Sequence, residues 1–239
     1  MKISIVIPTF NEEDYILETL LTIKENAVDP VEILIVDAGS EDATLPQLIE
    51  IANERFHVDQ ELRGKKFESL NTGAHLTSGD VILFLDADTL LPVGFDTMIK
   101  HAIVQGAVGG AFALRFDQAP FPLNIIRFFN HARYIFSKKY FGDQAVFCTR
   151  EAFNRVGGYP DLTVMESAHF CGALKQVGKL KLIKEPVITS SRRFIQGGIL
   201  KVFWNDLKIY LRDLAGLSNE QAGQEYWQAK VSPSPVDKS

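Results

Sequence analysis

Short apolar runs separated by helical patterns fill the first half of the chain. Three of these runs, residues 3–7, 31–36 and 81–85, are predicted to be buried strands. Apolar residues recur at helical spacing after Asn11, which we expect to cap the first helix, and we expect a further short strand to begin at Val58. Strands that alternate with helices predict a doubly wound, mostly parallel sheet. Ligands of such sheets bind beyond the carboxyl ends of the strands.

The second half of the chain has a less regular pattern. Residues 107–116 and 144–149 have strand-like composition, and the aromatic stretch 121–136 is predicted to be helical. Residues 200–214 carry an apolar stripe at helical spacing with basic residues beside it, which predicts an amphipathic helix. From residue 219 the chain is polar and contains two prolines, so we expect a disordered tail.

Composition narrows the class of protein. The 239 residues are 46% hydrophobic and 23% charged, as in a globular domain, and the net charge of −5 gives no overall attraction to nucleic acid. Cys148 and Cys171 have apolar neighbours, which favours buried thiols over a metal or disulfide framework. The start lacks signal-peptide features, and no uncharged apolar run reaches the roughly 18 residues of a membrane span. We therefore expect a cytoplasmic protein, either free or peripheral to the inner face of the membrane.

Two aspartates follow the strand predicted over residues 81–85. In LFLDADTLLP, Asp86 and Asp88 are two residues apart, so an extended backbone directs both carboxylates to the same side. Paired carboxylates at the end of a buried strand suit Mg²⁺ or Mn²⁺ that bridges phosphates. A turn in which these aspartates only cap the next helix is the alternative, and their position after a buried strand favours the metal site.

Other polar residues near predicted strand ends are weaker candidates. Asp37 ends the strand over residues 31–36, where a carboxylate can accept hydrogen bonds from a base or ribose. Lys65 and Lys66 follow a glycine and precede a predicted helix, where an ammonium group can meet a pyrophosphate. Adjacent surface lysines are more often only solvated, and of this pair we select Lys65 as a candidate ligand.

Three motifs, in order, resemble the inverting glycosyltransferases of family 2. They are IVIPTFNEEDYI from Ile5, ILIVDAGSEDAT from Ile33, and LNTGAHLTSGDVILFLDADTLLP from Leu70. A later segment, GDQAVFCTREAFNRVGGYPD from Gly142, resembles the acceptor-side segment of the same family. The resemblance therefore covers most of the chain before the predicted amphipathic helix.

The resemblance implies a fold and a reaction. The fold is the glycosyltransferase A type, a Rossmann-like, mostly parallel sheet flanked by helices, in one α/β domain over residues 1–218. A nucleotide-sugar-binding half would span 1–92 and an acceptor half 93–218. The donor would be a UDP- or GDP-linked sugar and the cofactor Mn²⁺ or Mg²⁺. The acceptor would be a saccharide, a lipid-linked molecule or another small molecule, attacking in one inverting displacement.

The same resemblance assigns residues to the donor. Asp88 is implied as the direct metal ligand, with Asp86 near both the metal and the ribose. Arg192 and Arg193 resemble the basic segment that meets a diphosphate or a lipid phosphate in related enzymes. The residues implied around the nucleotide are Pro8, Thr9, Glu12, Asp37, Asn71 and Asp86.

The sequence departs from the family at the expected general base. The family commonly has adjacent Glu and Asp on the acceptor side, whereas this chain reads VMESAHF, so Ser167 follows Glu166. A serine hydroxyl does not act as a base unaided. Glu166 and Asp143 are therefore the two candidate catalytic carboxylates. His169, one helical turn from Glu166, is better explained as a polar residue on a half-buried helix.

Two other functions compete with this one. DADT also fits the motif of aspartate-nucleophile phosphatases, with Asp86 as the nucleophile, although that motif normally opens its domain. A nucleotide-sugar-binding protein that has lost catalysis is the second alternative, because position 167 lacks an aspartate. The predicted amphipathic helix either packs on its own domain or lies on a membrane with Phe203, Trp204 and Tyr210 at the interface.

Overall fold

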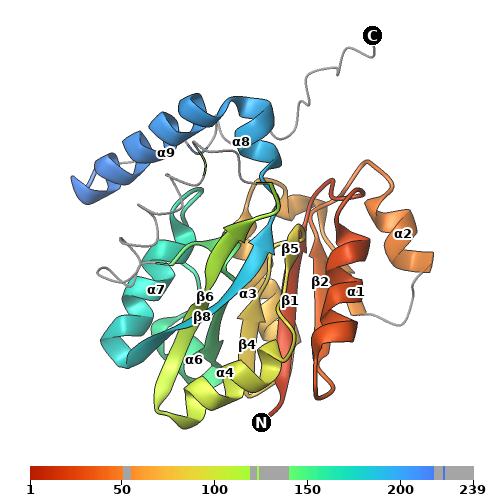
Figure 1. The fold of residues 1–239 in the computed structure, drawn as a ribbon, viewed down its shortest axis with the longest axis vertical. Coiled ribbons are helices and arrows are strands. Elements are labelled where there is room, and N and C mark those ends of the chain that lie inside the picture. Colours follow the sequence, from red (N-terminus) through yellow and green to blue (C-terminus); the bar gives the residue numbers. More distant parts are fainter. Residues whose placement is uncertain (51–54, 119–122, 124–139, 218–222, 224–239) are drawn as a thin grey trace.

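A three-layer arrangement of helices, sheet and helices forms the body of the computed structural model (Figure 1). It describes residues 1–50, 55–118, 123, 140–217 and 223. The helix predicted over 121–136 and the tail predicted after residue 218 fall almost entirely outside these residues. The described strands form one sheet of eight, in the order β3-β2-β1-β4-β7-β6-β8-β5. They are β1 (Ile3–Thr9), β2 (Glu32–Asp37), β3 (Arg55–Val58), β4 (Val81–Phe84), β5 (Thr89–Leu90), β6 (Ala107–Phe116), β7 (Val146–Thr149) and β8 (Lys179–Thr189).

The first four strands in sequence form the parallel part of this sheet, as predicted, with β2 and β4 on either side of β1. Strands β4 and β6 flank β7 in antiparallel pairs, and β6 pairs with β8 in parallel. Glycine is needed inside β6, because a Cβ at Gly110 would lie 1.9 Å from the Lys181 carbonyl oxygen of β8. The expected mostly parallel A-type sheet is therefore present, with an antiparallel centre that the pattern did not predict.

Helices cover both faces of the sheet. They are α1 (Ile16–Asn26), α2 (Thr44–Glu50), α3 (Lys66–Leu76), α4 (Phe95–Val104), α6 (Arg150–Val156), α7 (Glu166–Val177), α8 (Arg192–Gly197) and α9 (Ile199–Leu214), with short 3-10 turns η1 (Gln60–Leu62) and η2 (Gly142–Gln144). One apolar cluster joins α1 and α4 to one face of the sheet, and a second joins α3, α6 and α7 to the other. Helices α8 and α9 lie beyond the carboxyl ends of the parallel strands (Figure 1).

Close packing fixes the position of α3 over the sheet. A Cβ on Gly73 would lie 2.2 Å from a methyl carbon of Val6 on β1, so only glycine allows this approach. Phe67 and Leu70 from the same helix are buried against β1 and β2. The first residue of α3, Lys66, is thereby held near the strand ends.

Several predicted boundaries were wrong. Asn11 does not cap a helix: its backbone has a left-handed φ of 55°, its side chain accepts a hydrogen bond from the Glu41 amide, and α1 begins only at Ile16. Strand β3 ends at Val58 rather than beginning there. Pro8 lies within β1 and not after it. It pairs with Val36 on β2, while the pairing of β1 with β4 has already ended, so its missing amide is tolerated.

Candidate active site

A cavity of about 510 Å³ opens at the carboxyl ends of β1 and β4, beneath α8 and α9. We call its two groups of lining residues the polar side and the α9 side. The polar side comprises Thr9, Glu12, Lys66, Asp86, Asp88 and Arg192. The α9 side comprises Phe116, Met165, Phe194, Phe203, Leu207 and Tyr210. Charged groups and apolar groups thus share one cavity.

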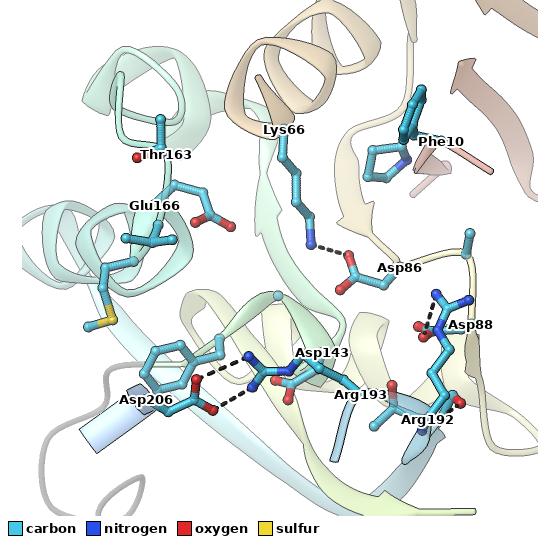
Figure 2. Close-up of a pocket in the computed structure, with 18 of the residues that line it drawn as sticks. Phe10, Lys66, Asp86, Asp88, Asp143, Thr163, Glu166, Arg192, Arg193 and Asp206 are labelled. Carbon is cyan, nitrogen blue, oxygen red and sulfur yellow. Dashed lines mark hydrogen bonds and ion pairs between the residues drawn. The ribbon is translucent and has the colours of Figure 1, made fainter. Parts of the chain in front are cut away.

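Asp86 and Asp88 both line this cavity, as their spacing predicted. The backbone turns tightly after β4, where the Thr89 amide donates to the Asp86 carbonyl over 3.1 Å, and the intervening Ala87 is buried in the core. Lys66 forms an ion pair with Asp86 at 2.5 Å, and Arg192 pairs with Asp88 at 3.1 Å (Figure 2). Each strand-end carboxylate therefore faces a cation from another element, Lys66 of α3 or Arg192 of α8.

The pairing of β5 with the end of β8 brings Arg192 to Asp88. Thr89 and Thr189 are register partners whose hydroxyls are 3.0 Å apart, and the Ser190 amide donates to the Asp88 carbonyl over 3.2 Å. The next residues of the chain therefore enter the cavity beside Asp88.

Arg192 is neutralised by two carboxylates at once. Its guanidinium donates to both Glu12 oxygens, over 2.7 and 2.6 Å, as well as approaching Asp88, and lies 4.3 Å from the Tyr15 ring centre. Burial by itself would lower the pKa of Arg192, but the carboxylates of Glu12 and Asp88 outweigh it and raise the pKa. Arg192 stays charged and ties the turn after β1 to the turn after β4.

Arg193, the next residue, points to a different part of the cavity. Its guanidinium forms a two-pronged ion pair with Asp206 of α9 (Figure 2). Both side chains are more than a third exposed. The two adjacent arginines thus form ion pairs on opposite sides of one cavity. Arg192 pairs on the polar side and Arg193 on the α9 side.

Glu166 lies at the first position of α7 and points toward Lys66 and Asp86 (Figure 2). The preceding residue, Met165, has a left-handed φ of 65°, which turns the chain abruptly into the helix. Burial raises the pKa of the Glu166 carboxyl, and the nearby Lys66 ammonium only partly opposes this effect. Its carboxyl group therefore holds a proton more readily than an exposed glutamate does.

Ser167, which replaces the expected aspartate, contacts the candidate base directly. Its buried hydroxyl donates to the Glu166 carboxylate over 3.1 Å. A Cβ on Gly142 would lie 3.0 Å from the Lys66 ammonium, 3.4 Å from the Ser167 hydroxyl and 3.5 Å from an Asp86 oxygen, so these groups converge on one small volume. Asp143, the other candidate base, follows Gly142 and also lines the cavity.

Three of the residues proposed from the sequence do not line the cavity. Asp37 is fully buried and its oxygens accept four hydrogen bonds, from Thr9, from the Gly39 amide, and from the amide and hydroxyl of Ser40. Asn71 exchanges two hydrogen bonds with the Tyr159 backbone. Lys65 points to the surface, where it pairs with Glu68 at 3.4 Å.

The other residues proposed for the site do line the cavity: Pro8, Thr9, Glu12, Asp86, Asp88, Asp143, Glu166, Arg192 and Arg193. Lys65 was the expected ligand of this pair, whereas the structure brings Lys66 to the cavity. The helical pattern carries the missing signal, because Lys66 is one turn from Ser69, which also lines the cavity, while Lys65 is one turn from the exposed Glu68. Asp206 had no comparable signal, since it reaches the cavity only through the packing of α9.

The carboxylates fit a divalent cation bound together with a substrate. The described part of the chain contains no cluster of three or more His, Cys, Asp or Glu side chains that could hold a metal by itself. Mg²⁺ and Mn²⁺ are commonly held by one or two carboxylates, with phosphate and water oxygens completing the shell. Asp86 and Asp88 place two carboxylates in the cavity that could hold such a cation.

Residues 4–159 match the family model described as glycosyl transferase family 2. The chain belongs to this family. Among curated proteins, the transferase is 26% identical to the O-antigen chain rhamnosyltransferase RfbN of Salmonella typhimurium, over 81% of this chain and 68% of that protein. It is 35% identical to poly-beta-1,6-N-acetyl-D-glucosamine synthase of Staphylococcus aureus, over 45% of this chain and 28% of that protein.

Solved structures agree on the A-type fold. The transferase resembles residues 1–349 of S. aureus TarS in complex with UDP, with a TM-score of 0.63 and 17% identity, over 81% of this chain and 61% of that one. It resembles the mannosyltransferase PcManGT of Pyrobaculum calidifontis, in complex with GDP-Man and Mn²⁺, with a TM-score of 0.60 and 26% identity, over 80% of this chain and 56% of that one. The chain thus spans a little over half of these solved chains.

The matches confirm the resemblance to family 2 and the A-type fold, and they support a glycosyltransferase. Nothing in the matches supports the phosphatase or the non-catalytic alternative. Both cysteines are free and buried, as expected. Among the helices that the structure describes, none is both long and apolar enough to cross a bilayer.

Proposed function

We propose that the transferase binds a UDP- or GDP-linked sugar with Mn²⁺ or Mg²⁺ and transfers the sugar to a small acceptor with inversion. The observation that carries this proposal is the convergence of Asp86, Asp88 and Glu166 on one cavity at the strand ends. Two similar structures support the choice of ligands, since one holds UDP and the other holds GDP-Man with Mn²⁺.

The polar side would receive the nucleoside diphosphate. Asp86 and Asp88 would hold the cation, which when bound supplies positive charge against the leaving diphosphate. Lys66 and Arg192 add ammonium and guanidinium groups that suit phosphate oxygens. Phe10, Ala38 and Leu62 line the same cavity with apolar surface that suits the flat face of a nucleobase.

Asp37 and Asn71 would act on the donor indirectly. With its hydrogen bonds to Thr9 and Ser40, Asp37 fixes the turns after β1 and β2. Asn71 fixes the backbone at Tyr159, whose ring stacks on Phe170 of α7 with centroids 4.1 Å apart. We therefore assign these residues to positioning.

Glu166 would act as the general base. Its carboxylate takes the proton of the acceptor hydroxyl as that oxygen forms a bond to the anomeric carbon. The bond from this carbon to the diphosphate oxygen breaks, and the nucleoside diphosphate leaves with the electron pair. The raised pKa of its carboxyl strengthens Glu166 as a base, and the Ser167 hydroxyl keeps the carboxylate oriented.

A thermal-shift screen tests the donor and the metal together. The protein is melted with UDP-, GDP-, dTDP- and CDP-linked sugars, each with and without Mn²⁺. Ligand at about a hundred times its Kd stabilises the native state by about 2.7 kcal/mol, so a rise in Tm is expected for one nucleotide class and only with Mn²⁺. The same screen on Asp88→Asn is the control. A rise of equal size without Mn²⁺, or in the variant, would contradict the metal assignment.

The stereochemical outcome needs its own measurement. Proton NMR of the first product formed reports the anomeric configuration before any later change. Inversion is expected, because a single displacement reverses the anomeric centre. Retention would show that the acceptor hydroxyl does not attack the anomeric carbon in a single displacement with Glu166 as its base.

A further inference from the structure

Helix α9 has two chemically different faces. Its inward face lines the cavity through Phe203 and Tyr210 and buries Ile209, while Leu207 lines the cavity from the border between the two faces. Its outward face carries large apolar side chains that are between 55% and 65% exposed: Leu200, Trp204, Leu211 and Leu214. Because these residues recur at spacings of four, seven and three, they form one continuous stripe along the helix. Of the three aromatic residues expected at a membrane interface, only Trp204 belongs to this stripe.

Charge is divided between the same two faces. The exposed charged residues of α9 are Lys201, Lys208 and Arg212, all of them basic. Both acidic residues turn inward: Asp206 pairs with Arg193, and Asp213 lies 2.6 Å from the His169 ring on α7. The outward face therefore carries three positive charges in a chain whose net charge is −5.

A second copy of this chain suits the outward face poorly. A two-fold dimer through α9 would place the same patch against itself, so three basic side chains would meet three others. An anionic lipid bilayer satisfies both features, because leucine and tryptophan enter the interface while lysine and arginine meet the headgroups. We propose that the outward face of α9 docks on an anionic membrane surface.

Docking through α9 would hold the cavity next to the membrane, since the inward face of the same helix lines it. The Arg193–Asp206 ion pair and the hydrogen bond between His169 and Asp213 fasten α9 to α8 and α7, so the helix need not leave the cavity to meet lipid. This proposal concerns binding alone. Membrane binding does not depend on which donor, metal or base the enzyme uses.

Vesicle sedimentation tests the proposal without any nucleotide sugar. The full chain is mixed with phosphatidylcholine vesicles that either contain or lack phosphatidylglycerol. We expect binding only to the anionic vesicles, weakening as salt rises. Replacing the other tryptophan, Trp227→Phe, isolates Trp204, whose emission should shift to shorter wavelength on binding. Binding that is equally strong to neutral vesicles, or absent from both, would overturn the proposal.

Two matched pairs of variants separate this face from general effects. K201E/K208E/R212E should lower partitioning at least about a hundredfold, since each basic residue near an anionic surface contributes roughly fivefold. K179E/K181E/K184E makes the same change of charge at exposed lysines of β8. This control should weaken binding only a few fold, through the change in net charge alone. Leu211→Glu should also lose binding, whereas Leu21→Glu on α1, where the native leucine is equally exposed at 55%, should not.

Control measurements keep these results interpretable. Circular dichroism melts identify a variant that fails to fold, and the Trp204 emission shift tests the unaltered face independently. Equal losses in both members of a pair would overturn the assignment to α9. Dimers that form without lipid and disappear in Leu211→Glu would also overturn it, in favour of self-association.

Discussion

The polar side of the cavity and its α9 side are assembled from the chain in different ways. The polar side takes Thr9, Asp86 and Asp88 from the ends of two adjacent parallel strands, each inside a short motif. The α9 side collects Phe116, Met165 and Phe203 from β6, the turn before α7, and α9. Parallel strands align their carboxyl ends automatically, whereas the α9 side exists only once distant elements have packed. The polar side should therefore respond sharply to single charge changes.

Asp88→Asn should have the largest effect. It removes a negative charge from the proposed cation site, so transfer should fall about a thousandfold or more and metal-dependent nucleotide binding should disappear. Activity and calorimetric binding assays measure the two losses. Asp80→Asn at the opposite end of β4 is the matched control and should keep wild-type activity, because Asp80 is exposed and distant from the cavity. Binding that survives in Asp88→Asn would contradict the metal assignment.

Glu166→Gln should reduce transfer about 10²- to 10⁴-fold, the usual contribution of a general base, while nucleotide binding stays within a few fold. Wild-type activity should fall as pH decreases through the raised pKa of Glu166, because the protonated carboxyl accepts no proton. The pH profile of kcat/KM measures this acidic limb, which should vanish in the variant. If Asp143→Asn shows these effects and Glu166→Gln does not, Asp143 is the base.

Stability provides an independent check on Glu166. The pKa of the Glu166 carboxyl is higher in the folded state than in the unfolded state. Ionisation of this carboxyl therefore destabilises the fold once the pH exceeds its pKa in the unfolded state. Glu166→Gln should therefore raise the Tm at neutral pH, and the gain should shrink as pH falls below the unfolded pKa. Thermal melts across pH measure it. An unchanged Tm at all pH values would contradict the burial assigned to this carboxylate.

Substitutions of the adjacent arginines compare the two sides directly. Arg192→Met removes the cation that neutralises the buried Glu12 and should lower the free energy of unfolding by about 3 kcal/mol. Arg193→Met breaks the more exposed pair with Asp206 and should cost about 1 kcal/mol or less. Urea denaturation measures both. Adding Glu12→Gln to Arg192→Met should recover part of the loss, and similar costs for the two single variants would contradict the difference in burial.

The two neighbouring lysines give the smallest predicted effect. Lys66→Gln should weaken donor binding about 10- to 100-fold, since one charge-assisted contact contributes roughly 1.5 to 3 kcal/mol and Asp86 would also lose its ion pair. Lys65→Gln, at a residue directed to the surface, should leave binding unchanged. Calorimetric titration with the preferred nucleotide measures both affinities. Equal losses of affinity in the two variants would show that Lys65 also contacts the donor.

The sequence by itself predicted the alternating strands and helices, the family, and the strand-end aspartates. Each of these depends on local periodicity or on a motif only a few residues long. It predicted the amphipathic pattern of α9 as well, but not which aromatic residues would face inward, because Phe203 and Tyr210 acquire their side only when the helix packs over the cavity.

The tertiary structure decided which cations meet the strand-end carboxylates. Arg192 reaches Asp88 because β8 pairs with β5, and Lys66 reaches Asp86 because Gly73 allows α3 to lie close against β1. The same packing separated Lys66 from Lys65 and placed the Ser167 hydroxyl on Glu166. Contacts between separate strands and helices leave no local pattern in a single sequence, since they depend on how these elements are arranged.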